Sequence, residues 1–273
     1  MGQPQNAAGA AVEPESTLLV NRRNMPHEID GGLAARARLG LVILSSDHTV
    51  EYEFHKILQE LPGVAVYGAR IRNSPNITPE TLADMEGRIA QTTDLILPGM
   101  PLDSVAYGCT SASMVIGEER VSELIRTARP GVPATNPVTA ARAAFAALGM
   151  RRIALLTPYS DEINQRMRGY FEACGLGVPV MGSFNEEDDN VAARVSLASI
   201  RDAALELGQE DSVDGVFVSC TSLRLIEVVS EIEEALGKPV TSSNHALAWH
   251  SLRLAGIDDT VPSQGKLFRE SGV

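Results

Sequence analysis

Cysteine is scarce in this sequence, with 3 residues of this type in a chain of 273. Three widely spaced cysteines cannot build the disulfide framework of a small secreted domain. No group of histidines and cysteines has the spacing of zinc ligands, and neither glycine-rich nucleotide-binding pattern is present. We therefore expect a reduced protein without a bound metal, and the sequence gives no support for a nucleotide.

Basic residues are also few, since 23 lysines and arginines face 35 aspartates and glutamates for a formal net charge of −12. An acidic surface repels phosphate backbones and anionic lipid, which argues against nucleic acid and membrane as partners. No apolar run reaches the roughly 18 residues of a membrane helix. The N-terminal stretch lacks the basic start and apolar core of a signal peptide, so we expect a cytoplasmic protein.

What the sequence has is an alternation of strand and helix patterns. Short apolar runs rich in Leu, Val and Ile at 38–45, 64–71 and 104–108 are typical of buried parallel strands. Helical spacing follows at 49–61 and 118–128, and Thr78 with Pro79 predicts a further helix start. This order predicts an α/β fold with parallel sheets flanked by helices.

The second half of the sequence repeats the first. Residues 37–47, "ARLGLVILSSD", match residues 151–161, "RRIALLTPYSD", and Cys-Thr-Ser occurs at both 109–111 and 220–222. "GVPAT" at 131–135 likewise matches "GKPVT" at 237–241. We interpret this as two pseudo-symmetric α/β lobes, at 38–150 and 151–237, that face each other across a cleft.

The two ends of the chain fit this scheme less well. Residues 1–37 are rich in Pro, Gly, Gln and Ala, and both a floppy tail and an arm that packs on a partner subunit fit this composition. Residues 238–273 form a C-terminal segment that we expect to return to the first lobe.

Cys109 and Cys220 each follow a predicted strand and precede two hydroxyl residues, Thr110 with Ser111 and Thr221 with Ser222. Ligands of open α/β sheets bind beyond the carboxyl ends of the strands. We expect each cysteine to open a helix, whose free N–H groups favour negative charge and lower a thiol pKa. With the neighbouring hydroxyls, such a site could hold a small carboxylate without a basic side chain.

A free cysteine is often only a small buried apolar residue, and Cys174, just before a glycine at a predicted helix end, has that interpretation. Two cysteines at matching positions of a duplicated lobe favour chemistry instead. Opposed thiols suit proton removal on one face of a substrate and delivery on the other, or attack and release.

These motifs resemble the aspartate/glutamate racemase superfamily, and within it the branch of maleate isomerases, arylmalonate decarboxylases and ectoine-utilization racemase-like proteins. The resemblance covers about residues 38–256 and lies in "SSDHTVE" (45–51), "YGCTSAS" (107–113), "TPYSDE" (157–162), "DDNVAAR" (188–194) and "SCTSLR" (219–224).

The resemblance implies cofactor-independent chemistry next to a carboxylate. Cys109 would be the nucleophile or base and Cys220 the partner acid, while Tyr159 and Asn190 match positions that bind the substrate carboxylate. Arylmalonate decarboxylases keep only the second-lobe cysteine, so Cys109 argues against simple decarboxylation.

Asp47 departs from the pattern, because maleate isomerases carry Asn in that place. A carboxylate in the cleft would favour an amino-acid-like substrate over a dicarboxylate, whereas the alternative role is a cap of the helix that follows. We expect an isomerase or racemase that acts on a small carboxylate as a homodimer or homotetramer. A decarboxylase and a non-catalytic small-anion-binding protein are the alternatives.

Overall fold

The computed structural model describes residues 20–74, 78–186 and 188–269 of the chain. The chain divides into two units, Met1–Gly32 and Leu33–Val273. In the first unit, residues 20–32 are irregular and exposed. Residues 1–19 of the predicted arm lie outside the described residues, so its role stays a prediction. The second unit contains the helices and strands.

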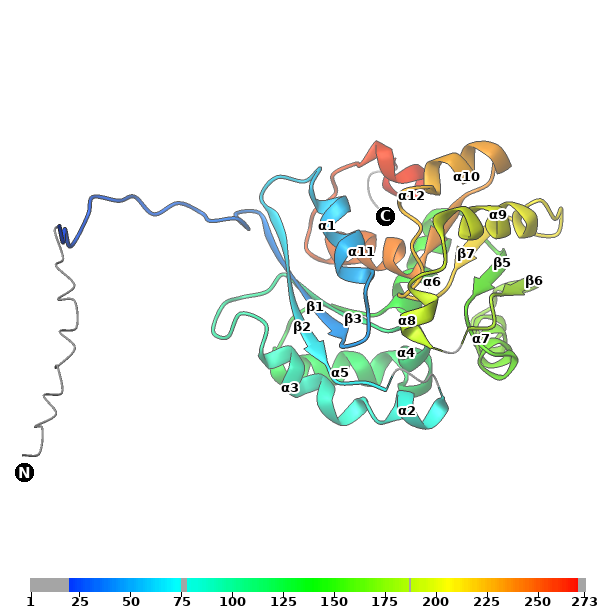
Figure 1. Ribbon diagram of the computed structural model, residues 1–273, viewed down its shortest axis with the longest axis horizontal. Coiled ribbons are helices and arrows are strands. Elements are labelled where there is room, and N and C mark those ends of the chain that lie inside the picture. Colours follow the sequence, from blue (N-terminus) through cyan, green and yellow to red (C-terminus); the bar gives the residue numbers. More distant parts are fainter. Residues whose placement is uncertain (1–19, 75–77, 187, 270–273) are drawn as a thin grey trace, which may run out of the picture. The chain divides into compact units, whose positions relative to one another are not determined.

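The first half of this unit alternates strands and helices as the sequence predicts (Figure 1). Its elements are β1 (Ala37–Leu44), α1 (Val50–Leu58), β2 (Val64–Ile71), α2 (Pro79–Ala83), a 3-10 turn (Glu86–Arg88), α3 (Ile89–Asp94), β3 (Ser104–Gly108), α4 (Thr110–Ile116), α5 (Glu118–Ala128), β4 (Ala134–Thr135) and α6 (Pro137–Ala147). Thr78 caps α2 and Pro79 occupies its first turn, as predicted.

The second half repeats this order. Its elements are β5 (Arg152–Thr157), α7 (Asp161–Ala173), β6 (Gly177–Ser183), α8 (Asp189–Ala192), α9 (Leu197–Gly208), β7 (Gly215–Val218), α10 (Val229–Leu236), β8 (Val240–Ser242), α11 (Ser243–Leu254), a 3-10 turn (Pro262–Gln264) and α12 (Gly265–Arg269).

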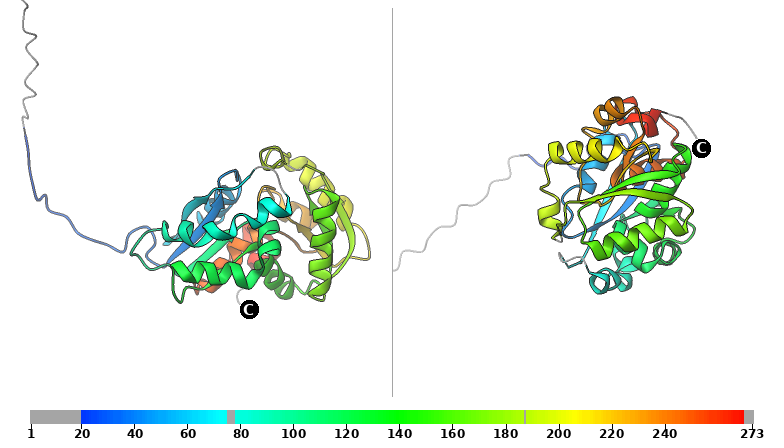
Figure 2. Two further views of the ribbon diagram at one scale, coloured as in Figure 1. Left: turned by 90° about the horizontal axis from the view of Figure 1, so that it is seen from below. Right: turned by 90° about the vertical axis from the view of Figure 1, so that its right-hand side faces the viewer.

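The two sheets have the same topology, which confirms the predicted duplication. Strands follow the order β2-β1-β3-β4 in one sheet and β6-β5-β7-β8 in the other, and every pairing is parallel. The rotated views of Figure 2 show helices on both sides of these sheets. β3 and β7 therefore occupy equivalent inner positions, and the residues after them lie at equivalent sheet edges.

Strand β1 shows why each sheet is covered on both faces. Its side chains alternate, so Leu39, Leu41 and Ile43 join the apolar cluster that contains Phe54 of α1. Val42 and Leu44 instead join the cluster on the other face, which includes residues of α2, α3 and α5. A strand that buries both faces is a nearly continuous apolar run, as β1 is after Arg38.

The helix that follows the fourth strand of each half, α6 or α11, packs on the other half. Phe145 of α6 packs edge-to-face on Phe217 of β7, with ring centroids 5.1 Å apart. In the reciprocal direction, α11 follows β8 of the second sheet and contacts β3 of the first. α6 and α11 also pack on each other, and each of the two apolar clusters contains residues of both halves.

Among the described residues, no helix is long and apolar enough to cross a membrane.

Candidate active site

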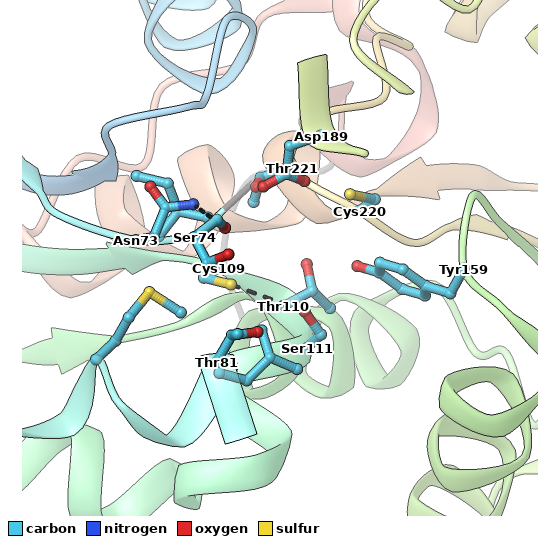
Figure 3. A pocket seen from close by; sticks show the side chains of 13 residues that line it. Asn73, Ser74, Thr81, Cys109, Thr110, Ser111, Tyr159, Asp189, Cys220 and Thr221 are labelled. Atoms are coloured by element: carbon cyan, nitrogen blue, oxygen red, sulfur yellow. Dashed lines mark hydrogen bonds between the residues drawn. The ribbon is translucent and has the colours of Figure 1, made fainter. Parts of the chain in front are cut away.

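A narrow pocket with a free volume of about 10 Å³ lies between the two halves, and the space around it, open solvent included, amounts to about 340 Å³. Figure 3 shows Cys109 and Cys220 at this pocket together with the Tyr159 ring, which extends into it. The described residues that line it are Leu44, Asn73, Ser74, Thr81, Leu82, Met85, Cys109, Thr110, Ser111, Tyr159, Asp189, Cys220 and Thr221. Both halves contribute, so the structure brings the two predicted cysteines to one place.

Cys109 is the residue before α4, with an extended backbone conformation (φ −151°, ψ 116°). Gly108 makes room for this turn, since a Cβ atom there would lie 3.1 Å from the carbonyl oxygen of Val42. The thiol lies 3.8 Å from the Ser111 hydroxyl. Thr110 donates its hydroxyl to Ser243 of α11 at 2.8 Å, which ties this turn to the other half.

Cys220 sits differently, and here the sequence prediction is wrong. It does not open a helix, because residues 221–222 form a turn and α10 begins only at Val229. The Cys220 sulfur accepts the backbone N–H of Ser222 at 3.3 Å. The carbonyl of Thr221 accepts hydrogen bonds from the Thr49 hydroxyl and, at 2.9 Å, from the Asn244 amide. Side chains rather than a helix therefore hold this cysteine.

The pKa values of both thiols are raised, whereas the sequence analysis expected them to be lowered. Burial raises the pKa of Cys109 well above its usual value, although the backbone N–H of Ala112 acts against this shift. Burial raises the pKa of Cys220 to about 12, and the charge of Asp189 adds to the effect. Burial therefore outweighs the backbone N–H groups, and both thiols are held in the neutral form.

Tyr159 lies beside Cys220 in the pocket (Figure 3), and only 2% of its surface is exposed. Its backbone is fixed on both sides, since its carbonyl accepts hydrogen bonds from Asn164 at 2.9 Å and Ser183 at 2.6 Å. A hydrogen bond with the Tyr159 hydroxyl opposes the rise of the Cys220 pKa. Burial, together with the charge of Cys220, raises the pKa of Tyr159 well above its usual value. The phenol therefore stays protonated and able to donate.

Asp189 is the carboxylate of the pocket, and the sequence analysis did not predict it as a site residue, nor did it predict the polar lining residues Asn73, Ser74 and Thr81. Its carboxylate is 5% exposed and accepts hydrogen bonds from Ser46 at 3.0 Å and Ser222 at 3.2 Å. Burial raises its pKa to about 6. The predicted Asn190 is instead exposed, with its amide oxygen 3.0 Å from His48 Nε2, and is not among the pocket residues. Its role in binding stays a prediction.

Asp47 is buried but does not line the pocket. Its Oδ1 atom accepts the backbone N–H groups of Thr49 at 2.7 Å and Val50 at 2.8 Å, where α1 begins. Burial raises the pKa of Asp47, and these hydrogen bonds oppose the shift. Of the two roles that the sequence left open, the observed contacts are those of a helix cap.

The remaining cysteine also corrects an expectation. Cys174 ends α7 and is exposed, whereas the sequence suggested a buried apolar residue. The glycine after it, Gly175, has a φ of 83° and turns the chain toward β6, so the side chain at the end of α7 remains at the surface.

The chemistry available in the pocket comes from thiols, hydroxyls and one carboxylate. No lysine, arginine or histidine lies among its described lining residues, so hydroxyl and backbone N–H groups are the donors that a substrate carboxylate would find. Within the described part of the chain, no three His, Cys, Asp or Glu side chains are placed to hold a metal ion. Two thiols beside a phenol can exchange protons with, or add to, a carbon placed between them.

Sequence comparison matches the chain to a known family. Residues 62–268 match the family model for arylmalonate decarboxylase. The chain is 35% identical over 144 residues to arylmalonate decarboxylase of Bordetella bronchiseptica, a match that covers 52% of this chain and 60% of that protein. It is 28% identical over 243 residues to maleate isomerase of Nocardia farcinica, which covers 85% of this chain and 96% of that enzyme.

Solved structures show the same architecture. A mutant of the Nocardia farcinica maleate cis-trans isomerase with a covalently bound succinylcysteine intermediate matches with a TM-score of 0.79 and 27% identity. That match covers 86% of this chain and 99% of the isomerase. The two parallel sheets flanked by helices are thus the fold of this group of proteins.

Proposed function

The chain belongs to the arylmalonate decarboxylase family, and on this premise we propose that it is a cofactor-independent two-cysteine isomerase. The reaction is a racemisation or a cis–trans isomerisation next to a carboxylate of a small substrate, either amino-acid-like or a dicarboxylate. The observation that carries this proposal is that Cys109 and Cys220 follow equivalent strands, β3 and β7, and line one pocket.

The pocket supports distinct roles for the two thiols. We assign Cys109 as the nucleophile or base and Cys220 as the partner acid. The Cys220 thiol, with its pKa of about 12, remains protonated and can deliver a proton. The Tyr159 and Ser111 hydroxyls are the donors for the carboxylate, and its developing charge would gain most from them in this buried site. The Thr110 hydroxyl already donates to Ser243.

Both thiols are neutral before substrate binds, and this state is compatible with reaction at a substrate carbon. A thiol of raised pKa is a weak nucleophile but, once ionised, a strong base. Removing a proton next to a carboxylate, or adding sulfur to a conjugated double bond, needs such a base or nucleophile. The covalent succinylcysteine in the related isomerase supports the addition of sulfur to carbon in that enzyme.

Arylmalonate-type decarboxylation is the second candidate, favoured by the 35% identity to the Bordetella bronchiseptica enzyme. A decarboxylase of this type would use Cys220 alone, as the acid that protonates the carbanion left by carbon dioxide. A small-anion-binding protein without catalysis would need neither thiol. Isomerisation or racemisation requires Cys109, whereas decarboxylation does not, so a variant that lacks Cys109 distinguishes the two.

The experiment is an assay in deuterated water with amino acids, N-acyl amino acids, unsaturated diacids and arylmalonates. Wild type is compared with Cys109→Ala, Cys220→Ala and the control Cys174→Ala. We expect isomerisation or α-carbon exchange to be lost in the first two variants and kept in the control. Decarboxylation that persists in Cys109→Ala would favour the second candidate, and full turnover by both pocket variants would exclude both.

The same proteins provide a test of assembly. We propose a homodimer or homotetramer, and sedimentation of the full chain distinguishes these from a monomer.

A further inference from the structure

The pocket holds one carboxylate that the proposed reaction does not use. Asp189 is buried, reaches the pocket from the first turn of α8, and shares the pocket with both thiols. Its charge raises the pKa of Cys109 and of Cys220, so it lies within electrostatic reach of the place where a substrate carbon must sit.

The hydrogen bonds of Asp189 fix it as an acceptor. The Asn73 amide donates to the Ser46 oxygen at 2.7 Å, which leaves the Ser46 hydroxyl proton to be donated to Asp189 Oδ2 at 3.0 Å. Ser222 donates to Oδ1 at 3.2 Å. Each carboxylate oxygen thus has one donor and retains a lone pair for a second one.

The charges around Asp189 show what that second donor would be. Asp47 and Asp188 add negative charge near it, and no basic side chain lies among the described residues of the pocket. A second carboxylate of a substrate placed here would face a buried anion with no compensating cation. An ammonium group would instead pair with Asp189 and offer up to three donors.

We propose that Asp189 selects substrates that carry an ammonium group on the carbon next to the reacting carboxylate, which makes the substrate class α-amino acids and their close derivatives. This inference rests on the proposed two-cysteine function of the same pocket and narrows it. The hydroxyls of Tyr159 and Ser111 bind the carboxylate, and Asp189 binds the ammonium group on the other side of the carbon.

Pairing of this kind also affects the thiols. The field of Asp189 is one of the causes that keep both thiols neutral. A bound ammonium group cancels that field and favours the thiolate. A substrate with an ammonium group therefore promotes ionisation of the base that acts on it, whereas a second carboxylate would oppose it.

The test is a binding comparison between 2-aminobutyrate and ethylmalonate, which differ in whether the α-carbon carries an ammonium group or a second carboxylate. Calorimetry at pH 7.5 measures both with wild type, Asp189→Asn and the control Asp188→Asn. Asp188 lies beside Asp189 and caps α8 through the Asn190 N–H at 2.8 Å, and Asn caps equally well. The control thus removes a neighbouring negative charge but keeps every side chain that lines the pocket.

We expect wild type and Asp188→Asn to bind 2-aminobutyrate at least about 10-fold more tightly than ethylmalonate, since hydrogen bonds to charged groups contribute about this factor. Asp189→Asn should lose the preference. Wild type that binds ethylmalonate equally well or better, or binds neither, overturns the inference, as does an unchanged preference in Asp189→Asn.

A measurement on wild type alone covers the case in which Asp189→Asn does not fold. The groups that face Asp189 are the carboxyls of Asp47 and Asp188, the thiols of Cys109 and Cys220 and, across the pocket, the Tyr159 phenol. Among the groups in the pocket itself, the thiols and the phenol stay neutral near pH 6.

Affinity for 2-aminobutyrate should therefore rise as the pH increases through about 6, where Asp189 loses its proton. Affinity that falls over this range would mean that protonated Asp189 donates to a carboxylate, and the inference would be wrong. Failure of the proposed function is separate, because it appears as turnover retained by both pocket cysteine variants and does not depend on which probe binds.

Discussion

The Oε1 atom of Glu53 accepts the backbone N–H of Leu225 at 2.6 Å, which joins helix α1 of the first half to the loop that carries Cys220. The Oε2 atom of Glu53 accepts the Asn244 amide at 2.8 Å, and this amide also donates to the Thr221 carbonyl. A buried carboxylate in one half therefore holds the cysteine loop of the other, and the position of Cys220 depends on it.

The first prediction follows from the protonation of Glu53. Burial raises the pKa of Glu53 from 4.5 to about 7, so between these values the folded protein binds a proton that the unfolded chain has released. The contribution of this group is fully present below pH 4.5 and is lost as the pH rises to about 7. Two to three pKa units correspond to about 3 kcal/mol.

Urea unfolding of wild type and Glu53→Gln between pH 4.5 and 8 measures the contribution of Glu53 protonation to the unfolding free energy. We expect the unfolding free energy of wild type to fall by about 3 kcal/mol relative to Glu53→Gln over that range. The exposed Glu119 provides a control, since Glu119→Gln should run parallel to wild type. Parallel curves for wild type and Glu53→Gln would show that Glu53 keeps an ordinary pKa.

The second prediction concerns Asp47, whose contacts are those of a helix cap. Asp47→Ala removes the acceptor of two buried N–H groups, at Thr49 and Val50, and should lower the unfolding free energy by about 1–3 kcal/mol. Asp47→Asn keeps an oxygen acceptor and should cost less. Thermal and urea unfolding check the stability. A large loss of substrate affinity in Asp47→Asn, without loss of stability, would restore Asp47 as a binding residue.

Most of the fold was accessible from the sequence because strands buried on both faces leave continuous apolar runs. The repeated segments at 37–47 and 151–161 became β1 and β5, the equivalent strands of two sheets with one topology. The packing of α6 on the second half was not predicted. Helix α6 is rich in alanine, and small side chains of this kind do not show in the sequence which sheet the helix covers.

The site was accessible where a residue directly follows an inner strand, as Cys109 does. The loop of Cys220 was misread because Leu223, Leu225 and Ile226 are all buried, as in a helix, whereas N–H groups of this loop are held by Glu53. In the run 188–190, three adjacent polar residues carry no periodicity. Asp189 faces the pocket because α8 begins at this residue, and the sequence does not show where this short helix begins.

The third prediction uses the different exposure of the cysteines. At pH 7.5, iodoacetamide should modify Cys174 first, because it is exposed, whereas Cys109 and Cys220 are buried and their pKa values are raised. Peptide mass mapping over time gives the order, and activity should persist after Cys174 is fully modified. Modification of a pocket thiol in step with Cys174 would contradict the raised pKa values.

The fourth prediction tests the phenol of Tyr159. Tyr159→Phe removes a buried donor that neighbours Cys220 and should lower kcat/KM roughly 5- to 150-fold, the equivalent of about 1–3 kcal/mol. Tyr170→Phe is the matched control, since the Tyr170 hydroxyl bonds to Glu118 outside the pocket. Equal kcat/KM for Tyr159→Phe and wild type would remove Tyr159 from the substrate site.

The last prediction concerns the division of labour between the thiols. If Cys109 and Cys220 act on opposite faces of the substrate, Cys109→Ser and Cys220→Ser each abolish net isomerisation or racemisation, because one face lacks its proton carrier. A partial reaction can survive on the other face. For a racemase, each variant should exchange deuterium from the solvent into one enantiomer only, and the two variants should have opposite preferences.

For a cis–trans isomerase the two variants should instead differ in kind. Cys109→Ser lacks the nucleophile and is inactive, whereas Cys220→Ser can still form the carbon–sulfur bond at Cys109 and accumulate a covalent adduct. Deuterium incorporation by NMR distinguishes the enantiomers, and intact-protein mass spectrometry detects the adduct. Near wild-type turnover in either variant would mean that a single cysteine is catalytic. If that variant is Cys109→Ser, a decarboxylase that uses Cys220 alone becomes the better description of this pocket.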